Sequence, residues 1–90
     1  MKHHLPYLGN DTATYEAAIL DILQKHPQSF SGVSITIHEA GKAGGAYTAR
    51  EAWPSGSKSA ADVAKLVAHK IVGEYKSHAG RLFTRVTLDF

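Results

Sequence analysis

Hydrophobic residues first recur with a helical period between residues 12 and 26. Apolar side chains at positions i, i+3, i+4, i+7 and i+8 share one face of a helix. They are Tyr15, Ala18, Ile19, Ile22 and Leu23. Asn10 or Asp11 can cap the first free amides, and Pro27 cannot continue a helix. The pattern therefore predicts an amphipathic helix over residues 12–26.

Apolar and polar residues then alternate strictly in residues 33–39, which predicts a strand with one buried side. The apolar residues of this strand are Val33, Ile35 and Ile37. Residues 40–45 are short and glycine-rich, as in a hairpin connection. Residues 46–53 predict the second strand of the hairpin. The sequence does not decide which side of this strand is buried, because apolar residues occur on both sides.

Helical spacing returns after residue 59, where Ser59 and Asp62 resemble a capping box with Asp in place of Glu. The apolar side of this second helix consists of Val63, Leu66, Val67, Ile71 and Tyr75. Ala79–Gly80 is a typical helix stop. Residues 82–90 alternate again and predict a last strand. On this strand we expect the side chains of Leu82, Val86 and Leu88 to face the helices.

These elements predict one α+β domain over residues 1–90 with the order αββαβ. A hairpin and a right-handed helical crossover give a three-stranded antiparallel sheet of strand order 2-1-3, with two helices on one face. Residues 1–9 contain Pro6 and Gly9 and show no period, so we expect an N-terminal arm. The opposite face of the sheet is then open to solvent.

Composition narrows the classes of function. Of the 90 residues, 43% are hydrophobic and 20% are charged, as in an ordinary globular chain. Zero cysteines exclude disulfides, thiolate catalysis and cysteine-ligated metals. The formal charge of +2 does not by itself predict nucleic-acid binding. With neither a signal-peptide pattern nor a long apolar run, we expect a cytoplasmic protein without a membrane span.

The strongest candidate site is the open face of the predicted sheet. We expect it to present Thr36, His38, Thr48, Arg50, Arg81, Phe83 and Arg85. Guanidinium groups pair with phosphates or carboxylates, and an exposed ring stacks on a base or packs into a partner. The alternative is an ordinary solvated face on which Phe83 lies under the N-terminal arm.

A second basic strip is expected on the outer side of the second helix, from Lys58, Lys65, His69 and Lys76. Such a strip is usually a solvated helix face. The histidines show no converging ligand spacing, so we expect neither a metal nor a cofactor. A small hydrolase or metal-dependent enzyme would require His38, Glu39 and Glu51 to meet in one cleft.

Because no catalytic spacing or cofactor loop is present, the sequence favours a non-catalytic protein-binding module. Its order of helix, hairpin, helix and strand resembles antitoxins of the HicB type and the phage-encoded anti-CRISPR proteins. The resemblance covers most of the chain and is architectural only. It implies a stoichiometric inhibitor of a nucleic-acid-handling complex, for which we expect Arg50, Phe83 and Arg85 as the main contacts. The alternative is a small basic nucleic-acid-binding regulator that uses the same face.

The order of elements leaves the assembly of the protein open. An unpaired edge strand of the predicted sheet could join a second copy into a homodimer. The pattern of residues does not identify the protein partner.

Overall fold

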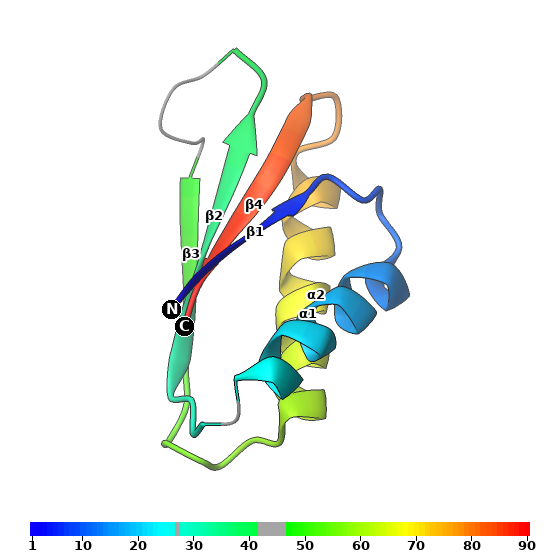
Figure 1. The fold of residues 1–90 in the computed structure, drawn as a ribbon. Coiled ribbons are helices and arrows are strands. Elements are labelled where there is room, and N and C mark those ends of the chain that lie inside the picture. The colour runs from blue at the N-terminus through cyan, green and yellow to red at the C-terminus, as the bar shows by residue number, and fades with distance from the viewer. Residues whose placement is uncertain (27, 42–46) are drawn as a thin grey trace.

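A computed structural model describes residues 1–26, 28–41 and 47–90. Its elements are β1 (Lys2–Pro6), α1 (Thr12–Lys25), β2 (Gly32–Glu39), β3 (Tyr47–Ala52), α2 (Ala60–Ser77) and β4 (Phe83–Asp89). Residues 42–46, which include most of the predicted hairpin connection at residues 40–45, lie outside the described residues. The chain forms an α+β fold in which one sheet carries two helices (Figure 1).

The sheet has four antiparallel strands in the order β1-β4-β2-β3. The expected three-stranded sheet of order 2-1-3 is therefore wrong. Residues 2–6, expected to belong to an arm, form the edge strand β1, which pairs with β4 from Lys2↔Asp89 to Pro6↔Arg85. The sequence of β1 hides this pairing because the strand is short and polar and ends in a proline, which only an edge or a strand end tolerates.

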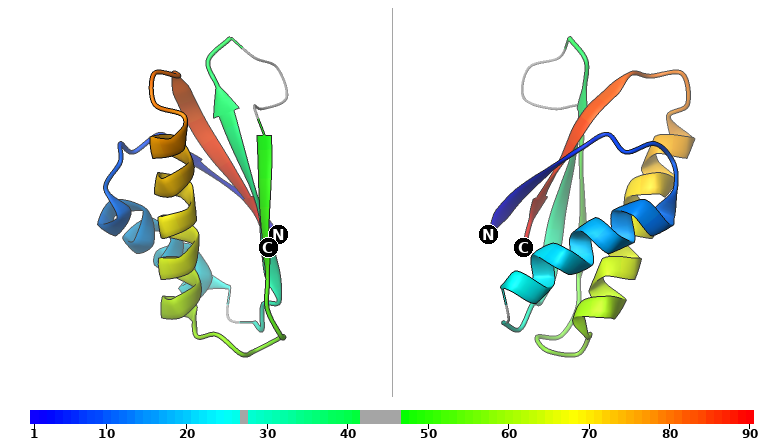
Figure 2. Two further views of the ribbon diagram at one scale, coloured as in Figure 1. Left: turned by 180° about the vertical axis from the view of Figure 1, so that it is seen from behind. Right: turned by 45° about the vertical axis from the view of Figure 1, so that its right-hand side comes forward.

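Both helices begin at the side chains that the sequence suggests. An Asp11 carboxylate oxygen accepts from the Ala13 amide at 3.1 Å, and the Ser59 hydroxyl accepts from the Asp62 amide at 3.2 Å. α1 and α2 pack against each other and lie on the same side of the sheet (Figure 1), as two further views confirm (Figure 2). Within the described ranges, neither helix is long and apolar enough to cross a membrane.

The hydrophobic core lies between this helix pair and the near side of the sheet. Its fully buried strand residues are Ile35, Ile37, Val86 and Leu88, and its fully buried helix residues include Tyr15, Ile19, Val63, Val67 and Ile71. The sheet therefore has two different sides. We call the side toward α1 and α2 the helix face and the other side the open face.

A register shift in the β2–β4 ladder changes the side on which the start of β4 presents its residues. His38 pairs with Arg85, whereas the next residue, Glu39, pairs with Phe83. Thr84 is thus an extra residue on β4, as in a β-bulge. Strict alternation, which would place Phe83 beside Arg85, fails at this point. Leu82, expected to face the helices, precedes the strand and is 77% exposed.

Candidate binding face of the sheet

The open face is built from side chains that the strand ladders place in three rows. Cross-strand partners share a face, so each row crosses the sheet. The first row contains Lys2, Asp89, Ser34 and Arg50; the second contains His4, Thr87, Thr36 and Thr48; the third contains Pro6, Arg85 and His38. Five of the residues predicted for this face therefore lie on it: Thr36, His38, Thr48, Arg50 and Arg85.

The centre of the open face is a hydroxyl held between two imidazoles. Thr87 Oγ1 lies 2.8 Å from His4 Nδ1 and 2.8 Å from His38 Nε2. A threonine hydroxyl has one proton and two lone pairs. It can therefore donate to one imidazole and accept from the other, or accept from both. The three side chains connect β1, β4 and β2 across the face.

A hollow of about 340 Å³ opens at this centre, lined by Lys2, His4, Thr36, His38 and Thr87. Every lining residue carries an N–H or O–H donor, and none is acidic. His38 and Thr87 are each only 8% exposed although no helix covers them. Burial lowers the pKa of His38 below its ordinary value, and the nearby charges of Arg85 and His4 act in the same direction. His38 is therefore neutral at neutral pH.

The β3 side of the open face carries further polar contacts. Thr36 Oγ1 lies 3.1 Å from Thr48 Oγ1, and Arg50 Nε donates to Ser34 Oγ at 3.3 Å. Both contacts are exposed, so the guanidinium of Arg50 stays accessible. Cations thus flank the hollow on the outer strands, with Lys2 on β1 and Arg50 on β3.

The structure corrects the predicted position of Phe83. Because of the bulge at Thr84, its ring is partly buried against the core, with its centroid 4.6 Å from that of Tyr75 in α2 and 6.3 Å from that of Tyr7. It does not lie beside Arg85 on the open face. The expected aromatic contact of that face is therefore absent from it.

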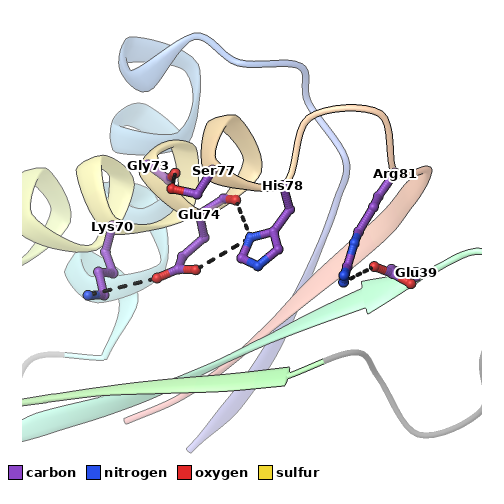
Figure 3. Close-up of polar contacts among 7 residues, drawn as sticks. All are labelled: Glu39, Lys70, Gly73, Glu74, Ser77, His78 and Arg81. Atoms are coloured by element: carbon purple, nitrogen blue, oxygen red, sulfur yellow. Dashed lines mark hydrogen bonds and ion pairs between the residues drawn. The ribbon is translucent and has the colours of Figure 1, made fainter.

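Arg81 is also placed differently from the prediction. Its Nη1 donates to Glu39 Oε1 at 2.7 Å, and the Glu39 side chain is only 8% exposed. Figure 3 shows Arg81 reaching from the α2–β4 connection to the end of β2. Glu39 pairs with Phe83 beyond the bulge. The Arg81–Glu39 ion pair therefore lies at the end of the sheet and not on the open face.

His38, Glu39 and Glu51 do not meet in one cleft. His38 belongs to the open face, whereas Glu51 pairs with the buried Val33. Glu51 Oε1 lies 3.5 Å from Lys70 Nζ of α2. Glu39 binds Arg81, as described above. Among the described residues, no group of three His, Cys, Asp or Glu side chains is arranged to hold a metal ion. The arrangement required for the hydrolase or metal-enzyme alternative is therefore not formed.

The predicted basic strip lies on the other side of the molecule. Lys65, His69 and Lys76 are exposed on α2, and Lys58, before its N-cap, is partly exposed. Figure 2 shows α2, which carries Lys65, His69 and Lys76, on the opposite side of the sheet from the open face.

Sequence reasoning missed three residues of the hollow: Lys2, His4 and Thr87. Thr87 has the same parity as Arg85, so alternation already placed it on the outer side. Lys2 and His4 could be found only by recognising β1. In the structure its residues alternate between exposed and partly buried from Lys2 to Pro6.

Comparison with family models, with curated proteins and with solved structures found no match to this chain.

Proposed function

We propose that the protein is a non-catalytic binding module that holds a single-stranded nucleic acid on the open face of its sheet. The observation that carries the proposal is the cross-strand arrangement of cations, imidazoles and hydroxyls on that face. Lys2, Arg50 and Arg85 can contact phosphates on successive nucleotides. The exposed imidazole of His4 adds a ring face, on which bases of single-stranded nucleic acids can stack.

The composition of the face favours nucleic acid over an acidic protein surface. Protein interfaces depend on buried aromatic or apolar anchors near their centre, whereas nucleic-acid interfaces are polar and strongly positive. Phe83, the expected anchor, packs on Tyr75, and the centre of the face is Thr87 with its two imidazoles. We place this function in the cytoplasm, with which a chain that forms no disulfides is compatible.

Binding of a fluorescent oligonucleotide tests the proposal. The variant Arg50→Glu with Arg85→Glu should bind a mixed-sequence single strand at least about tenfold more weakly, because two phosphate contacts become repulsive. The matched control is Lys65→Glu with Lys76→Glu, which makes the same change of charge on α2 and should retain affinity. With three cations at phosphates, the slope of log K against log salt should be about −2.

Equal losses of oligonucleotide affinity in the two double variants would mean that affinity depends on net charge alone, which would contradict the proposal. So would a wild-type protein that binds no oligonucleotide at low salt.

A second candidate is the anti-CRISPR-like inhibitor that docks on a nucleic-acid-handling complex. Two exposed apolar side chains favour it: Tyr7, 41% exposed, and Leu82, 77% exposed. Both adjoin Phe83 at the end of the sheet, since Leu82 precedes it and the Tyr7 ring lies 6.3 Å from its ring. Affinity for a protein partner that depends on Leu82 and changes little with salt would favour this candidate.

A further inference from the structure

The hollow beside Thr87 differs from the rest of the open face because it is recessed and lined by donors from three strands. Lys2 and His4 come from β1, Thr36 and His38 from β2, and Thr87 from β4. Thr87 contacts one nitrogen of each imidazole, and Thr36 contacts Thr48. The Lys2 ammonium and the other ring nitrogens of the two histidines can donate to one small group. The lining contains no carboxylate, so it does not suit a hard cation such as Ca²⁺ or Mg²⁺.

The charged groups around the hollow also favour an anion. Arg85 pairs with His38 on the neighbouring strand, and Lys2 lies at the rim on β1. The acidic residue of the adjacent row, Asp89, lies 3.3 Å from the amine of Met1, which offsets its charge. An anion in the hollow would therefore meet the Lys2 ammonium and two imidazoles, with the positive charge of Arg85 on the next row of the face.

We infer that this hollow binds a terminal phosphate group of a nucleotide or nucleic-acid strand. The inference rests on the proposed function and specifies which part of the ligand occupies the centre of the face. A phosphomonoester carries close to two negative charges near neutral pH and presents three acceptor oxygens. An internal phosphodiester carries one charge and continues into a nucleoside on both sides. A recess surrounded by the flat sheet face fits a chain end better than a chain interior.

Binding of a phosphate in the hollow is expected to depend on pH, because it favours protonation of His38. In the free protein, burial and the neighbouring Arg85 and His4 lower the pKa of His38, which favours its neutral form. A bound dianion favours the protonated imidazole, so binding takes up a proton. Affinity therefore rises as pH falls from about 8 toward about 6.5, until the phosphate itself gains a proton near its second pKa of about 6.

The experiment compares three oligouridylates of equal length by fluorescence anisotropy: one with a 5′-phosphate, one with a 3′-phosphate and one with hydroxyls at both ends. Wild-type protein should bind at least one phosphorylated strand about tenfold more tightly than the hydroxyl strand at about pH 6.5. Lys2→Gln and His38→Gln should each lose most of this preference. His69→Gln, the same substitution on the exposed side of α2, should retain it.

Equal affinity for all three strands would overturn the inference while leaving the proposed binding face in place. A preference that survives in His38→Gln would also overturn it. Circular dichroism and thermal unfolding of each variant separate a lost site from a lost fold.

Inorganic phosphate distinguishes failure of the site from failure of the proposed function. In NMR spectra, phosphate should shift the imidazole resonances of His4 and His38 more than chloride of equal ionic strength does. Such shifts without any oligonucleotide binding would support the phosphate site and contradict the nucleic-acid function. Resonances that respond equally to both anions would overturn the site.

Discussion

The two faces of the sheet are built from alternate residues of the same strands, yet they bury their side chains in different ways. On the helix face, Ile35 and Val86 are fully buried by apolar neighbours from α1 and α2. On the open face, Thr87 and His38 are each 8% exposed without any helix above them. Hydrogen bonds between side chains of three strands accompany that burial, since Thr87 lies 2.8 Å from both imidazoles.

The adjacent histidines of β1 show the same contrast. His4 faces the open side and contacts Thr87, whereas His3 pairs with Leu88 on the helix face. The Nε2 atom of His3 is buried and has no hydrogen-bond partner within the described part of the chain. The helix face thus stabilises apolar side chains and penalises a polar one. The open face can bury polar groups because it supplies their partners.

The largest difference is expected for neighbouring residues of β2. Ile35→Ala should lower the free energy of unfolding by about 2–5 kcal/mol, because a fully buried side chain leaves a cavity. Thr36→Ala, one position along on the open face, should cost about 1 kcal/mol or less, since it removes one exposed contact with Thr48. Urea unfolding of both variants measures the two values. Similar losses would mean that the two faces do not differ in this way.

Local patterns predict those parts of the fold whose partners are close in sequence or whose burial is one-sided. Both helices and the alternation of β2 followed from the spacing of their apolar residues. β1 could not be predicted in this way, because its pairing with β4 joins residues 79 to 87 positions apart and its own sequence carries little apolar signal. Missing β1 also meant missing Lys2 and His4, two of the five residues that line the candidate hollow.

The bulge explains the second failure of prediction. Alternation placed Arg81, Phe83 and Arg85 on one side of a continuous strand, which requires a regular ladder. The extra residue Thr84 reverses the sides before Arg85. Only Arg85 stays on the open face, while Phe83 packs on Tyr75. A single extra residue in a ladder is not visible in the apolar pattern, so it could not be anticipated.

An intermediate effect is expected for Phe83, which the bulge transfers from one face to the other. Phe83→Ala should lower the free energy of unfolding by about 2 kcal/mol, less than for a fully buried ring, because its packing on Tyr75 and Tyr7 is lost. Oligonucleotide affinity under folding conditions should stay within about twofold, since the ring is not on the open face. Retained stability with lost affinity would return Phe83 to the binding face.

The smallest expected effect is a dependence of stability on pH that both faces share. Burial is the main cause that lowers the pKa of His3 and of His38. His26, whose ring centroid is 5.2 Å from that of His3, lowers the pKa of His3 further. The unfolded chain therefore binds more protons than the folded chain as pH falls through the ordinary histidine range near 6.5. The free energy of unfolding therefore keeps its full value above that pH range and decreases below it.

Unfolding by urea at a series of pH values between about 8 and 5 measures the slope of the free energy of unfolding against pH. His3→Leu should flatten it and raise stability at acidic pH, because an apolar side chain suits a position beside Leu88 on the helix face. His38→Gln should also flatten it but should not raise stability, because the hydrogen bond to Thr87 is at best preserved. If both variants kept the wild-type slope, or if stability rose on acidification, burial of these imidazoles would not govern the acid response. A gain in stability from His3→Leu alone would show that only the open face compensates a buried imidazole.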